Sequence, residues 1–215
     1  MPDIVDPAEN KIPQKRRISW ARIVSDIVSP PLVWAILVVP VAFQYAETPV
    51  NAIFWAVLYA IFISLLPITY VAYNVWRGNI SDIHMKNRSE RLRPLLVSIL
   101  CTAIVWWLLK ILGAPRAFPL LALMSLVQIT VIALITLGWQ ISMHMMSIAG
   151  AVVAIGIIFS IGAALVMLPL VPLVAAARLN LKRHTPAQVI AGTVIGALLP
   201  AMFLGLIPAQ ILQIL

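Results

Sequence analysis

Three short polar segments of this chain carry residue types that bind and transfer phosphate. The first is KNRSERLRP, residues 86–94, in which Lys86 and Arg93 lie seven positions apart and Pro94 follows. Seven residues make about two helical turns, so on a helix or in a compact loop both cations can point the same way. Two fixed cations beside a helix start favour an anion, although such a cluster alone is more often only an orientation signal of a membrane protein.

The second segment places a histidine at the edge of an apolar run. Ser142, Met143 and His144 precede Met145 and Met146 and a long stretch without charge. An ionisable side chain at a membrane edge is a functional candidate, whereas a lone histidine at the interface often has no role beyond its hydrogen bonds. This segment therefore indicates a site only in combination with other residues.

The third segment, ARLNLKRHTPAQVIAG, combines a cation, a histidine and a helix start. Arg178 precedes His184, and Gln188 follows four positions later, close enough to accept a hydrogen bond from the ring. Thr185 and Pro186 are typical of the N-cap and first position of a helix. We therefore expect the His184 ring near the positive end of a helix dipole, which is a favourable place for phosphate.

The composition predicts that membrane helices position these residues. Hydrophobic residues make up 62% of the 215 and charged residues only 10%, whereas a soluble domain has about 25% charged residues. Apolar stretches that approach the length of a spanning helix cover residues 27–46, 51–75, 95–112, 118–140, 145–160, 163–179 and 187–212. We expect an all-α polytopic membrane helix bundle with six to seven transmembrane helices.

The expected organisation is one transmembrane domain preceded by a basic arm. The arm covers residues 1–26, and the domain covers residues 27–215 with the polar segments at 86–94, 141–144 and 177–188. The single cysteine, Cys101, excludes an intrachain disulfide and a metal site built from thiolates. No basic soluble face is visible, so nucleic acid is not an expected partner, and we expect membrane lipids instead.

In order and spacing, the three segments resemble the signature motifs of the type-2 phosphatidic acid phosphatase and vanadium haloperoxidase superfamily: K-x6-R-P, P-S-G-H and S-R-x5-H-x3-D. The resemblance covers about residues 86–196. The matching positions are Lys86, Arg93, Pro94, Ser142, His144, Arg178 and His184. The departures are Ile141 for Pro, Met143 for Gly, Ala177 for Ser and Gln188 for Asp. His84 matches no motif position, and we expect it at the surface.

The resemblance implies an integral membrane phosphatase that acts on a lipid phosphate or prenyl (di)phosphate without a metal or other cofactor. His184 would be the nucleophile that forms a phosphohistidine, and His144 the acid that protonates the leaving oxygen. The phosphate would be held by Lys86, Arg93, Ser142, the backbone amide of Met143, and Arg178. Gln188 can orient the His184 ring but supplies no negative charge. An alternative is therefore a degenerate protein that binds lipid phosphate or acts as a partner subunit.

Function and charge together predict the topology. One continuous span over residues 145–179 would put His144 and His184 on opposite faces of the membrane, so we expect two spans there. Then all but two of the 15 Lys and Arg residues, Lys110 and Arg116, lie on the side of the N-terminus. The positive-inside rule places this face, which carries the motifs, in the cytoplasm.

Overall fold

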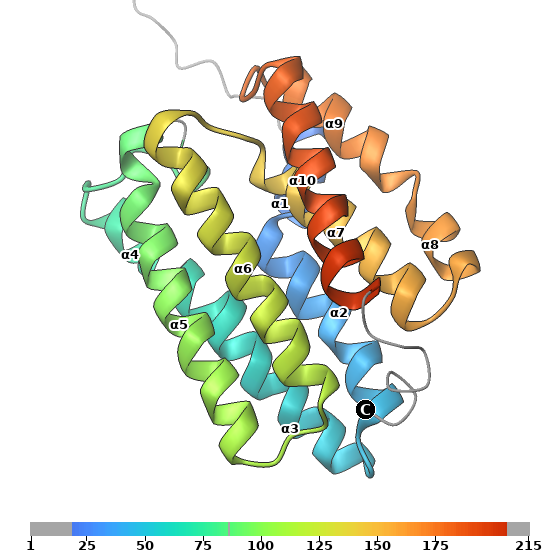
Figure 1. Cartoon of the computed structure of the whole chain (residues 1–215). Helices are drawn as coiled ribbons and strands as arrows, with labels where there is room; N and C mark the ends of the chain where they lie inside the picture. The colour runs from blue at the N-terminus through green and yellow to red at the C-terminus, as the bar shows by residue number, and fades with distance from the viewer. Residues whose placement is uncertain (1–18, 86, 206–215) are drawn as a thin grey trace, which may run out of the picture.

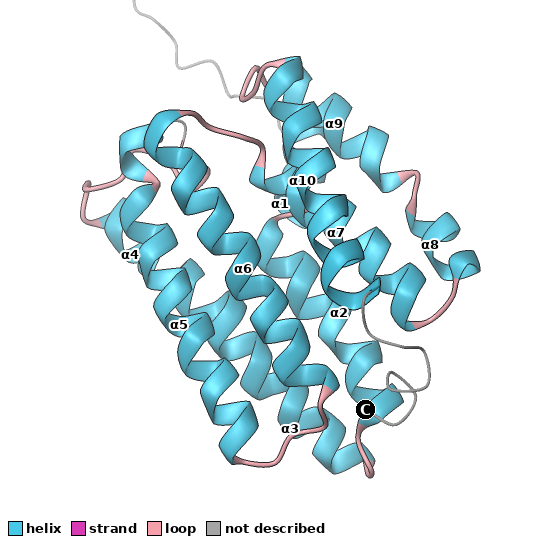
Figure 2. Cartoon of the chain, viewed as in Figure 1, coloured by secondary structure: helices cyan, strands magenta, loops and turns pink. Residues whose placement is uncertain are grey.

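The computed structural model describes residues 19–85 and 87–205, and all regular structure in these two ranges is helical (Figures 1 and 2). This confirms the predicted all-α bundle. The α-helices are α1 (Trp20–Ile27), α2 (Pro30–Tyr45), α3 (Pro49–Ala60), α4 (Leu66–Trp76), α5 (Leu92–Ile111), α6 (Ala117–Gly138), α7 (Met143–Ile158), α8 (Ile161–Met167), α9 (Leu170–Asn180) and α10 (Pro186–Gly205). A π-helical turn, η1 (Ile61–Leu65), joins α3 to α4, and a 3₁₀ turn, η2 (Arg88–Glu90), precedes α5.

Within residues 19–85 and 87–205, five helical stretches are long and apolar enough to cross a membrane, and the bent pair α1–α2 makes a sixth if it is one span. Helix α7 has only 16 residues and falls below that length. The surface of the bundle is apolar in the pattern expected of lipid-facing helices. On α10, for example, an exposed stripe recurs every four residues at Ile190, Val194, Leu198 and Met202.

Prolines account for the breaks in the long helices. Pro30 and Pro31 begin α2, and the chain bends by 50° between α1 and α2, because proline suits the first turn of a helix but not its interior. Pro67 lies in the first turn of α4, where its missing N–H interrupts the regular bonding pattern and the preceding turn widens into η1. These features shape the wall of the cavity described below.

The chain reverses direction after α7, as the two-span prediction requires. Helix α7 ends at Ile158, and Ser160 caps α8 by accepting a hydrogen bond from the Ala163 amide at 3.1 Å. Helices α8 and α9 then lead back to the end of the bundle where α7 began (Figure 1). His144 at the start of α7 and His184 after α9 therefore lie at the same end.

Helices α7 and α10 pack closely because α10 presents glycines to α7. A Cβ atom at Gly192 would lie 2.6 Å from the Ser142 carbonyl oxygen, and one at Gly196 would collide with the Met146 backbone. Both glycines are buried. Small residues of this spacing allow two helix backbones to approach each other, and here they bring the start of α7 against the start of α10.

Loops from distant parts of the chain meet at one end of the bundle. In Figure 1 the α4–α5, α6–α7 and α9–α10 connections lie at the top, and the α2–α3 and α5–α6 connections lie at the bottom. The end of α5 with Lys110 and the start of α6 with Arg116 belong to the lower end. Helix α1 packs beside α9, so residues 20–26, placed in the basic arm by the sequence, form part of the bundle.

Candidate functional site

An amphipathic cavity of about 510 Å³ opens at the end of the bundle where the loops meet. Its polar part is lined by side chains from several elements: Arg22, Asp26, His84, Arg91, His144, Arg178 and His184. The rest of the wall is largely apolar, with residues from α2, η1, α4, α5, α6 and α7: Trp34, Ile63, Pro67, Val71, Leu95, Ile129, Ile132 and Met146. The cavity thus joins a cationic compartment to a hydrocarbon-like one.

His184 is held in a single tautomer by the start of α10. Its Nδ1 lies 3.1 Å from Gln188 Oε1, and the Thr185 amide donates to the same oxygen at 3.2 Å. A backbone N–H can only donate, so the atom it contacts is the amide oxygen, and His184 Nδ1 must carry the proton that it shares with this oxygen. The Nε2 atom is then left with a free lone pair.

Gln188 also completes a capping box at the N-terminus of α10. Its backbone N–H donates to Thr185 Oγ1 at 3.4 Å while its side chain accepts from the Thr185 amide. This reciprocal pairing is typical of Ser or Thr followed three positions later by Glu or Gln. Gln188, which stands where the motif has Asp, therefore both caps α10 and contacts His184, the candidate nucleophile.

The environment of His184 keeps the ring neutral. Burial is the main cause that lowers its pKa to about 4, and the positive charges of Arg178 and Arg91 lower it further. The hydrogen bond with Gln188 opposes these effects only in part. Near neutral pH the ring is consequently uncharged, which is the form that can act as a nucleophile.

Arg178 and His144 meet on Ser25, a residue of α1. Arg178 Nη1 donates to Ser25 Oγ at 2.6 Å, and His144 Nε2 lies 3.1 Å from the Ser25 carbonyl oxygen. Because a carbonyl oxygen only accepts, His144 carries its proton on Nε2. Arg178 is 2% exposed, and its Nε has no partner within the described part of the chain. A buried guanidinium with donors to spare is suited to binding an anion.

His84 lies inside the site, which corrects the expectation that it is a surface residue. Its side chain is only 16% exposed, Nε2 is 3.1 Å from Asp26 Oδ1, and Nδ1 is 3.8 Å from Asp82 Oδ1. The ring stacks on His144 with centroids 5.8 Å apart. Burial and Arg178 lower the pKa of His84, whereas Asp26 and Asp82 raise it, and the net direction is downward.

Asp82 neutralises a cation at the rim of the site. Arg183 Nη2 lies 2.6 Å from Asp82 Oδ2. Burial raises the pKa of Asp82, but the hydrogen bonds and charges of Arg183 and His84 outweigh it, and the pKa lies below its usual value. A second hollow of about 280 Å³ adjoins this rim, with Arg22, Asp26, His84, Arg178 and Arg183 among its lining residues.

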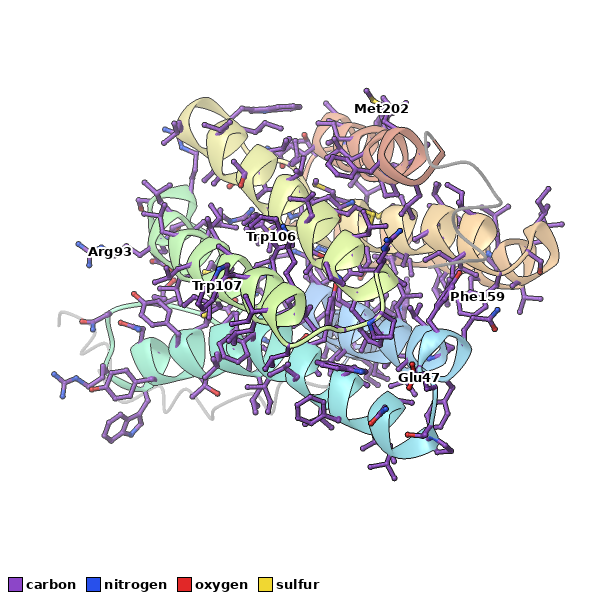
Figure 3. The ribbon with its side chains drawn as sticks, turned by 60° about the horizontal axis from the view of Figure 1, so that its bottom comes forward. Glu47, Arg93, Trp106, Trp107, Phe159 and Met202 are labelled. Atoms are coloured by element: carbon purple, nitrogen blue, oxygen red, sulfur yellow. The ribbon has the colours of Figure 1, made fainter. Side chains whose placement is uncertain are left out.

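Arg91, and not the motif residue Arg93, faces the cavity. Arg91 is 2% exposed and its Nε donates to the Met85 carbonyl at 2.8 Å, whereas Arg93 is exposed and points away from the helices in Figure 3. Two residues along a helix turn the side chain by roughly 200°, so Arg91 and Arg93 cannot share a face. Arg91, Pro94, Leu95 and Ser98 instead form the helical stripe that lines the cavity.

The remaining predicted residues have separate placements. Lys86 lies outside the described residues. Ser142 is fully buried as the N-cap of α7, where its Oγ accepts from the Met145 amide at 3.4 Å and its own amide donates to the Gln188 carbonyl oxygen at 3.1 Å. Met143 lines the cavity. The structure thus brings together His144, Met143, Arg178, His184 and Gln188, but not Arg93.

The predicted set of site residues did not include four residues that the structure adds to the site, namely Ser25, Asp26, His84 and Arg91. For Arg91, the helical spacing to Pro94, Leu95 and Ser98 was a usable signal. The other three precede the motifs and reach the site only through the packing of α1 and the α4–α5 loop. Among the described residues, no group of His, Cys, Asp and Glu is arranged to hold a metal ion.

Comparison with known proteins provides no further assignment for this site. No protein-family model matches the chain, and no curated protein or solved structure matches it.

Proposed function

We propose that this protein is an integral membrane phosphatase that hydrolyses a lipid phosphate or prenyl (di)phosphate through a phosphohistidine. The observation that carries the proposal is the meeting of a neutral His184, a buried Arg178 with spare donors, and Arg91 at the polar end of an otherwise apolar cavity. A phosphate among these groups would be neutralised by the two guanidinium groups. The motif resemblance supports the same reaction.

The proposed reaction has two steps, each balanced by a proton transfer. In the first, the lone pair of His184 Nε2 attacks phosphorus, the bond from phosphorus to the ester oxygen breaks, and His144 protonates the leaving oxygen. Because the Nε2–H of His144 is engaged by Ser25, the donated proton is a second one on Nδ1. His144 therefore enters this step as an imidazolium, a form that the negative charge of the bound phosphate favours, and leaves it neutral. In the second, water attacks phosphorus and gives a proton to His144 Nδ1, and the bond from phosphorus to His184 Nε2 breaks. Inorganic phosphate leaves, and neutral His184 and the imidazolium of His144 are restored.

The shape of the cavity supports a lipid as the substrate. A ligand that fits this space places a charged group beside the arginines and its apolar part against the apolar wall, to which α2, α4, α5, α6 and α7 contribute. His144 lies in the first turn of α7, at the end of the bundle where the loops meet, and we expect the headgroup of a membrane lipid at this level. By the excess of Lys and Arg on this face, we place the site on the cytoplasmic side.

Phosphate release by the purified full-length protein tests the proposal. We expect inorganic phosphate from at least one member of a panel of lipid phosphates and prenyl diphosphates, and a loss of at least about 10³-fold in His184→Ala because the nucleophile is absent. Arg93→Ala is the control, since this exposed residue lies away from the cavity, and its activity should remain. Equal release by wild type and His184→Ala would contradict the proposal.

A further inference from the structure

The apolar part of the cavity contains a second group of polar side chains, away from the arginines. Ser98, Ser125, Gln128 and Ser147 line it from α5, α6 and α7. Two of them have partners within the protein: Ser98 Oγ donates to the Pro94 carbonyl at 2.9 Å, and Ser125 Oγ lies 3.1 Å from Tyr59 Oη. These two hydroxyl groups therefore already have hydrogen-bond partners within the protein.

Gln128 and Ser147, in contrast, each carry a polar atom without such a partner. Each is 4% exposed, and Gln128 Nε2 and Ser147 Oγ have no hydrogen-bond partner within the described part of the chain. A buried donor left unpaired is unfavourable, and most buried polar groups in proteins have a partner. Both residues line the cavity, and rotation of either side chain toward it would present its unpaired donor to a hydrogen-bond acceptor in the ligand.

The position of this pair relative to the phosphate end follows from the geometry of α7. Ser147 lies one turn after His144, about 4.5 Å along the helix axis. Gln128 Nε2 packs against the next turn, 2.8 Å from where a Cβ atom of Gly150 would lie, which is about 9 Å along the axis from His144. Gln128 and Ser147 thus lie below the charged end, where a lipid passes from its headgroup to its hydrocarbon.

We propose that Gln128 and Ser147 form a second polar subsite that binds an oxygen of the ligand, such as an ester carbonyl, between its phosphate and its hydrocarbon chain. The inference rests on the proposed function for the placement of the phosphate. In an acylglycerol phosphate the ester carbonyl follows the phosphate across the glycerol backbone and can accept from these donors. A prenyl chain has no oxygen at this level and leaves both donors unpaired.

A pair of ligands that differ in one carbonyl oxygen tests this subsite. The probes are 1-acylglycerol 3-phosphate and its 1-alkyl ether analogue of equal chain length. For wild type we expect kcat/KM, and the affinity measured by displacement in detergent micelles, to favour the acyl form by about 5- to 15-fold, as one hydrogen bond provides. No preference in wild type would overturn the inference.

Variants then assign the preference to these two side chains. Gln128→Leu and Ser147→Ala each remove a donor at similar or smaller volume, and both should reduce the acyl-to-ether ratio toward one. Ser98→Ala is the matched control, because its hydroxyl is already bonded to Pro94. A wild-type ratio retained in both Gln128→Leu and Ser147→Ala would show that the carbonyl is bound elsewhere, or that water satisfies these donors.

The same measurements separate the subsite from the phosphatase proposal. Binding is measured with His184→Ala protein, in which no turnover is expected. Preferential binding of the acyl form without hydrolysis by wild type would support the subsite and contradict the enzyme. Hydrolysis of both lipids at equal kcat/KM would support the enzyme and overturn the subsite.

Discussion

Three neighbours, Gln188, Thr185 and Arg178, determine the tautomer and the protonation state of the His184 ring. Gln188 accepts the Nδ1 proton, and the Thr185 amide fixes the orientation of that acceptor. Burial and the charge of Arg178 then keep the ring neutral, with a pKa of about 4. A carboxylate in place of Gln188 would orient the ring equally well but would stabilise its protonated form. The glutamine therefore alters the pH range of the site more than its geometry.

This difference predicts the pH dependence of activity at the residue scale. In wild type, kcat/KM should fall on the acid side only as the pH approaches about 4, because protonation removes the nucleophile. In Gln188→Asp the new carboxylate raises the pKa of His184, so the acid limb should move to higher pH. The measurement is the pH profile of kcat/KM for both proteins on the same lipid phosphate. Because the substrate is the same, its own titration affects both profiles equally.

Two outcomes of this comparison would count against the assignment of Gln188. Coincident acid limbs would mean that residue 188 does not act on the titrating group. Absence of turnover in both proteins, with lipid phosphate still bound, would favour the binding protein or partner subunit over the enzyme.

Arg91 and Arg93 show what a motif can and cannot predict at this scale. The motif spacing predicted Arg93, because Lys86 and Arg93 are separated by whole turns of an uninterrupted helix. In the structure η2 ends before α5 starts at Leu92, and the face of α5 toward the cavity is that of Arg91. A cation near this position was predictable, but which of the two arginines faces the cavity depends on where α5 begins.

At the scale of elements, the contact between α7 and α10 keeps the two histidines together. His144 is in the first turn of α7, and His184 immediately precedes α10. The Ser142 amide donates to the Gln188 carbonyl oxygen at 3.1 Å, and Gly192 and Gly196 allow the backbones to approach. Small residues four positions apart are typical of such close helix contacts, and this one lies within the bundle.

A methyl group at this contact should therefore destabilise the protein. In Gly196→Ala the new Cβ meets the Met146 backbone, which cannot move aside as a flexible side chain would. Overpacking of this kind costs about 1–3 kcal/mol and lowers the melting temperature by roughly 2–10 °C in a chain of this size. Thermal unfolding in detergent measures the effect.

Gly138 provides the control for this substitution, because nothing lies within 4 Å of a Cβ atom there. Gly138→Ala should melt like wild type. If Gly196→Ala melts at the same temperature as Gly138→Ala, the proposed close contact between α7 and α10 is not present.

Helix ends were more predictable than helix bends. The apolar stretch 118–140 corresponds to α6 at Ala117–Gly138, and the uncharged turn near Ser160 is the N-cap of α8, because apolar length and capping residues are local properties. The joining of Trp20–Ile27 to the bundle was not predicted. Residues 20–26 were assigned to the basic arm, whereas Ala21 and Ser25 are buried in α1, which packs on α9.

At the scale of the whole molecule, packing at one end of the bundle creates the site. Ser25, Asp26 and His84 belong to no motif. Ser25 contacts both Arg178 and His144. His84 stacks on His144, and Asp26 contacts His84. These contacts join residues more than 50 positions apart. They are a property of the folded chain, and one sequence alone gives no signal for them. The arrangement of charge between the two ends, in contrast, was readable from the sequence.

That arrangement leads to a prediction about orientation in the membrane. With Cys101 replaced by alanine, single cysteines are introduced by Ser89→Cys in the loop region at the motif end and by Glu47→Cys in the α2–α3 turn at the opposite end; both positions are exposed. Because Lys and Arg are retained on the cytoplasmic side, a membrane-impermeant maleimide should label Glu47→Cys in intact cells and Ser89→Cys only after permeabilisation. The reverse pattern would place the motif end outside the cytoplasm, and a substrate would then reach the cavity from the outer leaflet.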